Sequence, residues 1–246
     1  MKLRPHAPTH ISVFVLLILC ALSPARAQQL AAAADASPFD SLAQEVIGEI
    51  NLARTRPAEY AAYLEQLRPH FNGKEYRRAG RPALLTEEGA APLEEAIKFL
   101  RHLKPLPPLQ VAGGLCSGAR VLVEDQAATG ATGHKGSDGG FCEQRLQRFG
   151  SWQGDIGENL TYGPETGRER VLTLLIDDGF ANRGHRLRIL SPDYKVVGVA
   201  CGGHKMGSLC VINFAGGFND GPKAAQPSAT QKAAPAPKLP AGARRI

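Results

Sequence analysis

The sequence predicts an α+β fold in which helices come first and an antiparallel β-hairpin comes last. Residues 194–201 and 209–215 alternate or run apolar with many β-branched side chains, which is typical of paired strands. No internal repeat is visible in the sequence. In the N-terminal part, apolar residues recur at intervals of three and four, as on the buried face of a helix; they are Phe39, Leu42, Ala43, Val46, Ile47 and Ile50.

This first helix has Ser37 as its candidate N-cap. Pro57 opens a second helix over residues 58–67, because proline is favoured in the first helical turn. Both are expected to be amphipathic packing helices.

Residues 71–108 are the least regular part of the predicted domain, and we interpret them as an insertion near the N-terminal side of the core. Residues 73–81 are basic and turn-rich, and residues 103–108 contain three prolines. Between these stretches a short helix is indicated by the spacing of Leu93, Ile97 and Leu100.

Two more helices are expected in the second half of the chain. Ser117 is a candidate cap for a helix over residues 118–128, which Thr129-Gly130 ends. Thr166 and Glu169 have capping-box spacing and open a helix that stops at Asp177-Asp178-Gly179. Two acids at the negative end of a helix dipole are unfavourable, so these carboxylates either serve a site or only initiate the turn.

The two ends of the chain differ in composition from the middle. Residues 1–27 carry Lys2 and Arg4, an apolar run over 11–22 and then Ala25-Arg26-Ala27, which is typical of a secretory signal peptide. The apolar run is short for a membrane span, which needs about 20 residues; a lipidated Cys20 is the alternative. The mature chain is therefore expected to be secreted or periplasmic, without a transmembrane segment.

The rest of the chain is expected to form one domain over residues 39–220, after a short linker over 28–38. Residues 221–246 are rich in proline, alanine and lysine and are predicted to be a disordered tail. This tail is either a spacer, a weak contact with anionic envelope polymers, or a solvated end without a partner.

The charge of the folded part excludes a nucleic-acid-binding domain. The whole chain has 29 basic and 23 acidic residues, but three of the basic ones lie in residues 1–27 and five in 221–246, with no acid in either. Residues 28–220 therefore carry 21 basic against 23 acidic residues, a net charge near −2. Nucleic-acid-binding domains concentrate positive charge on the domain itself.

Four cysteines remain after signal-peptide cleavage, and an even number in an exported chain favours disulfides. Cys201 and Cys210 flank eight residues between the two predicted strands, so they are expected to pair across the hairpin. A Cys116–Cys142 bridge follows by elimination. No Cys-x-x-Cys occurs, which argues against a cysteine-rich zinc site.

Three glycine-marked segments carry the candidate site: His134-Lys-Gly-Ser-Asp138, Gly157-Glu158-Asn159-Leu160 and Gly184-His185-Arg186. We expect them to be loop-like, because glycine allows unusual backbone angles and close approach of other groups. Together they suggest one assembled polar site. Each histidine alone also fits a hydrogen-bonded structural residue.

These motifs, in this order and followed by the Val-Gly-Val stretch of the hairpin, resemble the CAP superfamily, whose domain is also called the SCP domain, in its bacterial secreted branch. The resemblance covers about residues 39–218, with residues 71–108 as its unfamiliar part. It implies an α/β/α sandwich. It also matches Asn51 and Arg54, which we interpret as structural.

The resemblance implies a cleft with two histidines and two carboxylates. His134 and His185 match the histidines and Glu158 matches the first carboxylate, while either Asp177 or Asp178 fills the place of the second. Two imidazoles with carboxylates favour zinc over calcium or magnesium, which prefer all-oxygen shells. Without a metal, the same groups suit general acid–base chemistry.

We therefore expect a secreted binding or interaction module able to hold a divalent metal, rather than an enzyme. Its extracytoplasmic ligand, whether protein, peptide, lipid or envelope polymer, is open. Alternatives are a hydrolase acting on peptide or envelope material through the same residues, and a lipid- or sterol-binding module. No Gly-x-Ser-x-Gly or His-Glu-x-x-His motif is present. The sequence does not identify a general base for Ser137 as a nucleophile. We assign no role to His204.

Overall fold

The computed structural model describes residues 38–163, 165–222 and 224. The predicted signal peptide, the linker up to the candidate cap Ser37, and the predicted tail from residue 225 onward lie outside the described residues. None of the helices in the described part is long and apolar enough to cross a membrane.

A four-stranded sheet lies at the centre of the domain and has the strand order β4-β6-β7-β5. It is formed by β4 (Gln110–Val111), β5 (Gly150–Tyr162), β6 (Val196–His204) and β7 (Gly207–Asp220). β4 runs parallel to β6, and the β5–β7 and β6–β7 pairs are antiparallel. β6 and β7 are the predicted C-terminal hairpin. The 13-residue strand β5 was not predicted.

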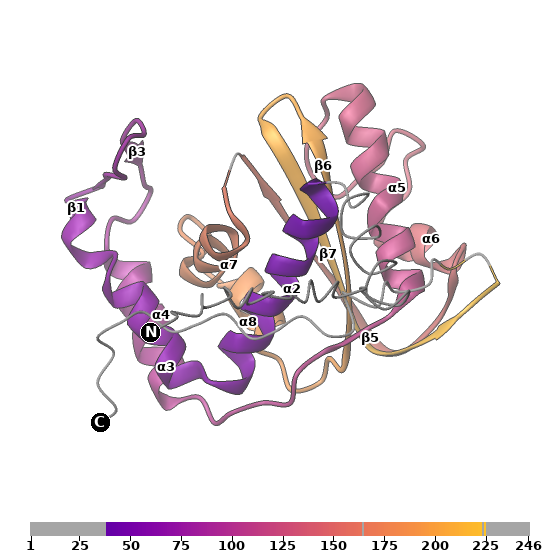
Figure 1. The fold of residues 1–246 in the computed structure, drawn as a ribbon, viewed down its shortest axis with the longest axis horizontal. Coiled ribbons are helices and arrows are strands. Elements are labelled where there is room, and N and C mark those ends of the chain that lie inside the picture. Colours follow the sequence, from indigo (N-terminus) through magenta and orange to yellow (C-terminus); the bar gives the residue numbers. More distant parts are fainter. Residues whose placement is uncertain (1–37, 164, 223, 225–246) are drawn as a thin grey trace, which may run out of the picture. The chain divides into compact units, whose positions relative to one another are not determined.

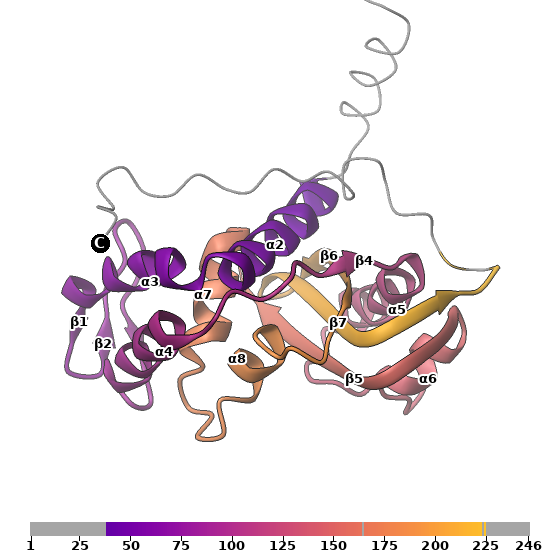
Figure 2. The same ribbon diagram turned by 90° about the horizontal axis from the view of Figure 1, so that it is seen from below.

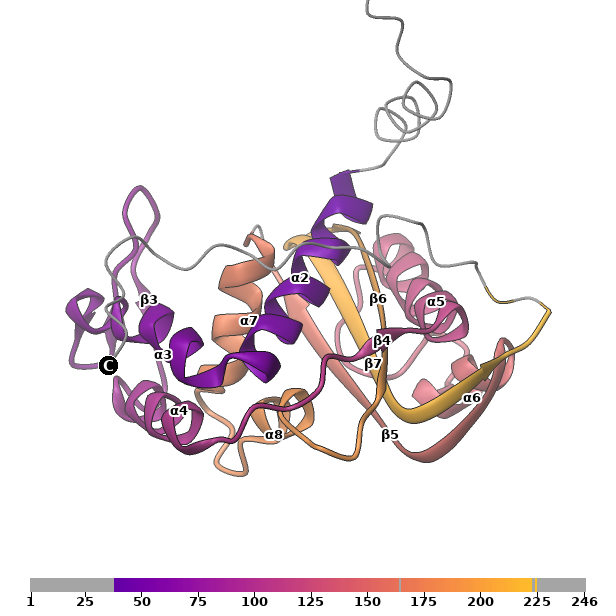
Figure 3. The ribbon, with the colours of Figure 1, turned by 60° about the horizontal axis from the view of Figure 1, so that its bottom comes forward.

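Helices cover both faces of this sheet, so the predicted sandwich is confirmed (Figures 1 and 3). α5 (Gly113–Thr129) and α6 (Cys142–Gln147) lie on one face. α2 (Pro38–Thr55), α7 (Gly167–Ile176) and α8 (Gly184–Ile189) lie on the other, where they share the largest hydrophobic core with the strands.

The first two predicted helices are present as α2 and α3 (Pro57–Glu65). Pro57 occupies the first turn of α3, where its missing N–H leaves no helical hydrogen bond unmade.

The helix predicted to start at 118 begins five residues earlier, as α5, and Ser117 is not its cap. Ser117 lies inside the helix, where its hydroxyl donates to the Gly113 carbonyl at 3.0 Å. Instead, the carboxylate of Asp220 accepts from the amides of Gly113 (3.1 Å) and Gly114 (2.7 Å). Gly130, with φ +67°, ends the helix as predicted.

Local signals placed α7 correctly. Thr166 accepts from the Glu169 amide at 3.3 Å, and the Glu169 carboxylate accepts from the Thr166 amide at 2.9 Å, which is the predicted capping box.

A short 3₁₀ helix (Arg68–His70) leads into the insertion, which folds into a small antiparallel sheet and a helix (Figure 2). The sheet contains β1 (Phe71–Asn72), β2 (Glu75–Tyr76) and β3 (Leu84–Leu85). The helix, α4 (Ala91–His102), contains the predicted apolar positions Leu93, Ile97 and Leu100, all of them buried. The small sheet itself was not predicted.

Arg54 joins α2 to two other segments of the domain, one around residue 107 and one over residues 189–194. Its guanidinium, 1% exposed, donates to the carbonyls of Pro107 (3.1 Å) and Ile189 (2.8 Å). It also donates to the carbonyls of Ser191 (2.8 Å) and Tyr194 (3.3 Å). Burial lowers the pKa of Arg54 to about 10, so the group stays charged at neutral pH. Arg54 therefore has the structural role expected for it.

Only half of the predicted disulfide pattern is present. Cys201 and Cys210 are opposite each other in the β6–β7 hairpin and are bridged, as predicted. The expected Cys116–Cys142 bridge is wrong, because both are buried free thiols. Cys116 lies where α5 approaches Gly198 of β6, and the Cys142 thiol donates to the amide oxygen of Asn213 on β7 at 3.4 Å.

We predict that Arg54→Met lowers the free energy of unfolding by about 3 kcal/mol, because four buried or half-buried carbonyls lose their donors. Denaturant unfolding measures this loss. Arg120→Met is the matched control, since Arg120 is half exposed and makes a 3.6 Å surface ion pair with Asp40; a change within about 0.5 kcal/mol is expected there. Equal effects of the two changes would contradict a special role for Arg54.

We predict that the thiols of Cys116 and Cys142 are inert in the folded protein. Burial raises the pKa of Cys116 to about 11 and raises that of Cys142 well above its usual range, so the reactive thiolate is scarce at neutral pH. Ellman's reagent should detect no thiol in the native protein and two in denaturant without reductant. If no thiol is detected in denaturant, Cys116 and Cys142 form a disulfide after all.

Candidate functional site

The first half of the candidate site is a pair between His134 and Glu158. The Nδ1 atom of His134 lies 2.9 Å from Oε1 of Glu158. His134 is in the loop between α5 and α6, as expected, whereas Glu158 lies in the strand β5 and not in a loop. A strand fixes the direction of the Glu158 side chain more tightly than a loop does, since successive side chains point to opposite faces.

Arg145 on α6 completes this pair and was not predicted from the sequence. Its guanidinium donates to Oε2 of Glu158 at 2.7 Å, and both side chains are almost fully buried. It also donates to the carbonyls of His134 (3.1 Å) and Gly140 (3.2 Å), so it ties the loop to the strand at two points. A carboxylate bonded to a buried guanidinium only accepts, so His134 donates from Nδ1.

The second half of the candidate site is a pair between His185 and Asp177. The Nδ1 atom of His185 lies 2.6 Å from Oδ1 of Asp177. Oδ2 of Asp177 accepts from the backbone amides of His185 (2.8 Å) and Arg186 (3.3 Å), in the first turn of α8. His185 is therefore in a short helix rather than in a loop.

This arrangement explains the acid at the end of α7. Asp177 has left-handed backbone angles, with φ +60°, which direct its carboxylate away from its own helix. There it bonds to free amides at the start of the next helix, where a negative charge is favourable.

Asp178 has a different role from Asp177. Its two carboxylate oxygens accept from the backbone amides of Glu87 (2.7 Å) and Glu88 (2.9 Å) in the insertion. Arg183, in the loop after α7, donates to the carboxylates of Glu88 (2.6 Å) and Glu95 (2.8 Å). The structure thus pairs Asp177 with His185, and uses Asp178 to attach the insertion to the loop that precedes His185.

Consecutive residues of β5 connect the two histidine–carboxylate pairs. Glu158 bonds to the His134 ring, and the side-chain amide of Asn159 donates to the backbone carbonyl of His185 at 3.1 Å. These two side chains point to opposite faces of β5, which is the last strand of its sheet among the described residues. In the described part of the chain, no three histidine, cysteine or acidic side chains gather as they would around a metal ion.

The two imidazoles share one further property. Each uses Nδ1 for its carboxylate, and within the described residues neither Nε2 atom has a hydrogen-bond partner. The His134 side chain is 47% exposed and that of His185 is 16% exposed. The Phe180 ring packs edge-on against the His185 ring, with centroids 4.8 Å apart.

Glycine is required at one of the motif positions by close approach. A Cβ at Gly157 would lie 2.7 Å from the Tyr194 hydroxyl and 3.1 Å from Cδ of Arg188. The glycine before Glu158 therefore lets the segment after α8 pack directly against β5.

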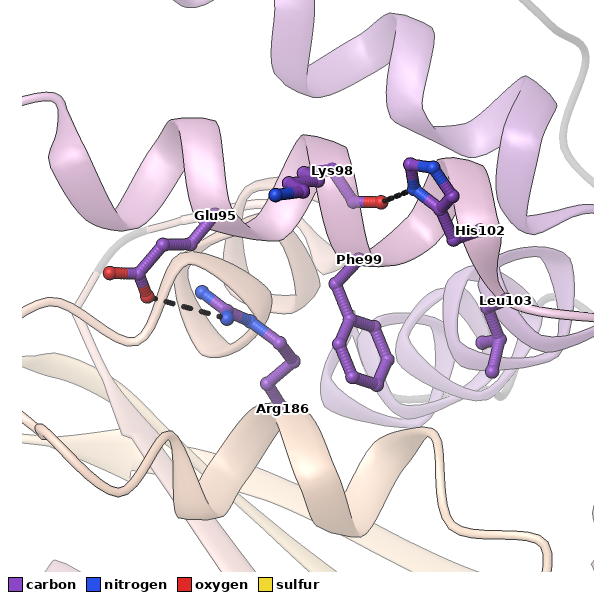
Figure 4. A pocket seen from close by; sticks show the side chains of 6 residues that line it. All are labelled: Glu95, Lys98, Phe99, His102, Leu103 and Arg186. Carbon is purple, nitrogen blue, oxygen red and sulfur yellow. Dashed lines mark hydrogen bonds and ion pairs between the residues drawn. The ribbon is translucent and has the colours of Figure 1, made fainter.

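A separate open pocket of about 470 Å³ lies between α4 and α8 (Figure 4). Figure 4 shows Arg186, the neighbour of His185, with its guanidinium 3.7 Å from Glu95 on the other side of the pocket. The pocket contains neither histidine pair; it is lined by Glu95, Lys98, Phe99, His102, Leu103 and Arg186.

Comparison with known proteins agrees with this fold and these motifs. The model of the CAP family, described as the cysteine-rich secretory protein family, matches residues 94–214, from α4 to β7. The chain belongs to this family, as its motifs predicted, and every candidate site residue lies within the match. A search of curated proteins gave no significant match.

Three solved structures are similar to parts of the chain. They are an extracellular SCP-domain protein from Bacillus anthracis (23% identity, TM-score 0.37), an outer surface protein from Borrelia burgdorferi (17%, 0.37) and a cysteine-rich secretory protein from Staphylococcus aureus (16%, 0.35). The likenesses cover 49%, 45% and 55% of this chain, and 37%, 78% and 41% of those proteins, respectively.

We predict strong coupling between Arg145 and Glu158 in a double-mutant cycle. Arg145→Met should cost about 3–5 kcal/mol of folding free energy, because it leaves the Glu158 carboxylate buried without its cation. Adding Glu158→Gln should recover at least about 1 kcal/mol of that loss.

The control cycle uses Arg68→Met and Glu94→Gln, a half-exposed pair at 2.7 Å. Its coupling should stay below about 1 kcal/mol. Additive effects at Arg145 and Glu158 would show that the buried pair is not coupled.

Proposed function

We propose that this chain is a secreted CAP-domain module that binds a divalent metal, preferably zinc, through the Nε2 atoms of His134 and His185. Glu158 and Asp177 are then orienting groups rather than metal ligands. One observation carries the proposal: each imidazole is bonded to a carboxylate through Nδ1, which leaves its Nε2 atom for a ligand.

The bonding of each imidazole supports zinc. Metal-binding histidines commonly donate their other ring N–H to a carboxylate, which fixes the tautomer and makes the ligand nitrogen more basic. His134 and His185 both have this arrangement at Nδ1. A neutral ring that donates from Nδ1 has its lone pair at Nε2, where a metal would bind.

The same bonding argues against calcium and magnesium, which need several oxygen ligands. The Glu158 oxygens are engaged by His134 and Arg145. Those of Asp177 are engaged by His185 and by backbone amides. Two imidazoles alone leave positions on zinc for water or for a group of the bound partner.

The contacts of Ser137 favour binding over serine-type hydrolysis. Its hydroxyl donates to the Asp125 carboxylate, and its amide donates to the same carboxylate at 3.1 Å. The hydroxyl is therefore not bonded to His134, which would have to act as its base. When bound, zinc would supply a Lewis acid, so a metal-dependent hydrolase remains the alternative that activity assays address.

An extracytoplasmic location is part of this proposal. The N-terminal pattern of a signal peptide and the Cys201–Cys210 bridge both support it, since disulfides persist in oxidising compartments. The solved structures similar to parts of this chain are described as extracellular, outer surface and secretory proteins. The partner is then an extracytoplasmic molecule, such as a protein, peptide, lipid or envelope polymer.

We predict that the tag-free protein binds one zinc ion at pH 7.5 and binds it more weakly at pH 5.5. Protons compete with a metal ion for the imidazole nitrogens as the pH falls. His134→Ala combined with His185→Ala should abolish binding. Glu158→Gln should weaken it by about tenfold, as expected for an orienting carboxylate. Titration calorimetry measures each affinity.

His102→Ala is the control, because His102 is an exposed histidine of α4. It should leave the affinity unchanged. A larger loss from Glu158→Gln than from removal of both imidazoles would favour calcium or magnesium. If zinc, calcium and magnesium all give no binding heat, both histidine–carboxylate pairs have only a structural role.

A further inference from the structure

A closed ring of hydrogen bonds holds the residue that precedes His134. The Gly133 amide donates to the Tyr162 hydroxyl at 2.9 Å, and that hydroxyl donates to Oε1 of Gln126 at 2.9 Å. The side-chain amide of Gln126 then donates to the Gly133 carbonyl at 2.6 Å. Both polar groups of Gly133 are thus fixed by side chains from α5 and β5.

The tip of the β6–β7 hairpin holds the same loop two residues earlier. Nε2 of His204 lies 2.9 Å from the Ala131 carbonyl, and Nδ1 of His204 accepts from the Met206 amide at 3.3 Å. With Nδ1 accepting, Nε2 carries the proton and donates to Ala131. The His204 ring also packs against the Tyr162 ring, with centroids 5.1 Å apart.

Gln126 is buried at a position where an apolar side chain would otherwise be expected. Gln126 is fully buried and lies one turn beyond Leu122 and Val123, which pack against the sheet. A buried amide is unfavourable unless its hydrogen bonds are made. Among the described residues, the Gln126 side chain bonds to Gly133 and Tyr162 alone, so its bonding serves the loop rather than the core.

We propose that Gln126, Tyr162 and His204 are positioning residues for His134. They fix the backbone before His134, while Arg145 holds the His134 carbonyl and Glu158 holds its ring. The His134 ring is thereby held in the Nδ1–H tautomer before any ligand arrives. This deepens the proposed function and rests on it only for the identity of the ligand, because the tautomer is a property of the free protein.

The test compares Tyr162→Phe and His204→Phe with wild type. Both keep an aromatic ring and remove the hydrogen bond to the loop. The first readout is the ¹⁵N chemical shifts of the His134 ring without metal, which report the nitrogen that carries the proton. Wild type should show the Nδ1–H tautomer, and both variants should show a mixture of tautomers. The second readout is zinc affinity, expected to fall about 3- to 10-fold for the loss of one hydrogen bond.

Two further variants separate positioning from general damage. Tyr76→Phe makes the same change in the small sheet of the insertion, and it should leave the His134 tautomer and the zinc affinity at wild-type values. His204→Gln keeps a side-chain N–H donor for the Ala131 carbonyl, so it should restore much of what His204→Phe loses. Thermal unfolding confirms that each variant is folded before it is compared.

The positioning role is overturned if folded Tyr162→Phe and His204→Phe both keep the wild-type tautomer. It is also overturned if Tyr76→Phe changes that tautomer as much as they do. If wild type does not bind zinc, the proposed metal function is wrong. The positioning role is still tested in that case, because the tautomer of His134 is measured without metal.

Discussion

Buried guanidinium groups hold together the irregular backbone segments of this domain. A backbone carbonyl that is buried outside regular structure needs a donor, and one arginine supplies five N–H groups. Arg54 supports the segments around 107 and 189–194, Arg170 those around 161–165, and Arg186 the end of α7. Desolvation lowers the pKa of all three, and the carbonyl bonds offset that cost. The sheet and helices keep their relative positions because these connections are fixed.

The candidate site uses the same chemistry with carboxylates added. Arg145 bonds to Glu158 and to the His134 backbone, and Arg183 bonds to the Asp177 carbonyl at 3.0 Å as well as to the insertion. In each half, a cation fixes the chain and a carboxylate bonds to an imidazole through Nδ1. Under the proposed function only the two Nε2 atoms would contact the metal, and the carboxylates would orient the histidines rather than bind it.

Sequence reasoning succeeded where the interacting residues are close in the chain or lie opposite each other in a hairpin. The Thr166 capping box and the Cys201–Cys210 bridge are of this kind. It failed where a distant residue decides the outcome: Asp220 starts α5 from 106 positions away. The glycine-rich strand β5 lacks the long β-branched run of a strand and is recognised by its pairing with β7. Counting cysteines predicted a second bridge, but it gives no account of where α5 and α6 direct their thiols.

The attachment of the insertion to the loop before His185 bears on the order in which the molecule folds. Arg183 reaches Glu88 across 95 positions of sequence, whereas Arg145 reaches Glu158 across 13. Contacts between distant residues form later, because the chain loses more entropy when a long loop closes. We therefore expect the His134 half to assemble early with its strand, and the His185 half to be completed last. A folding chain would then pass through an intermediate with one histidine in place and the other still unanchored.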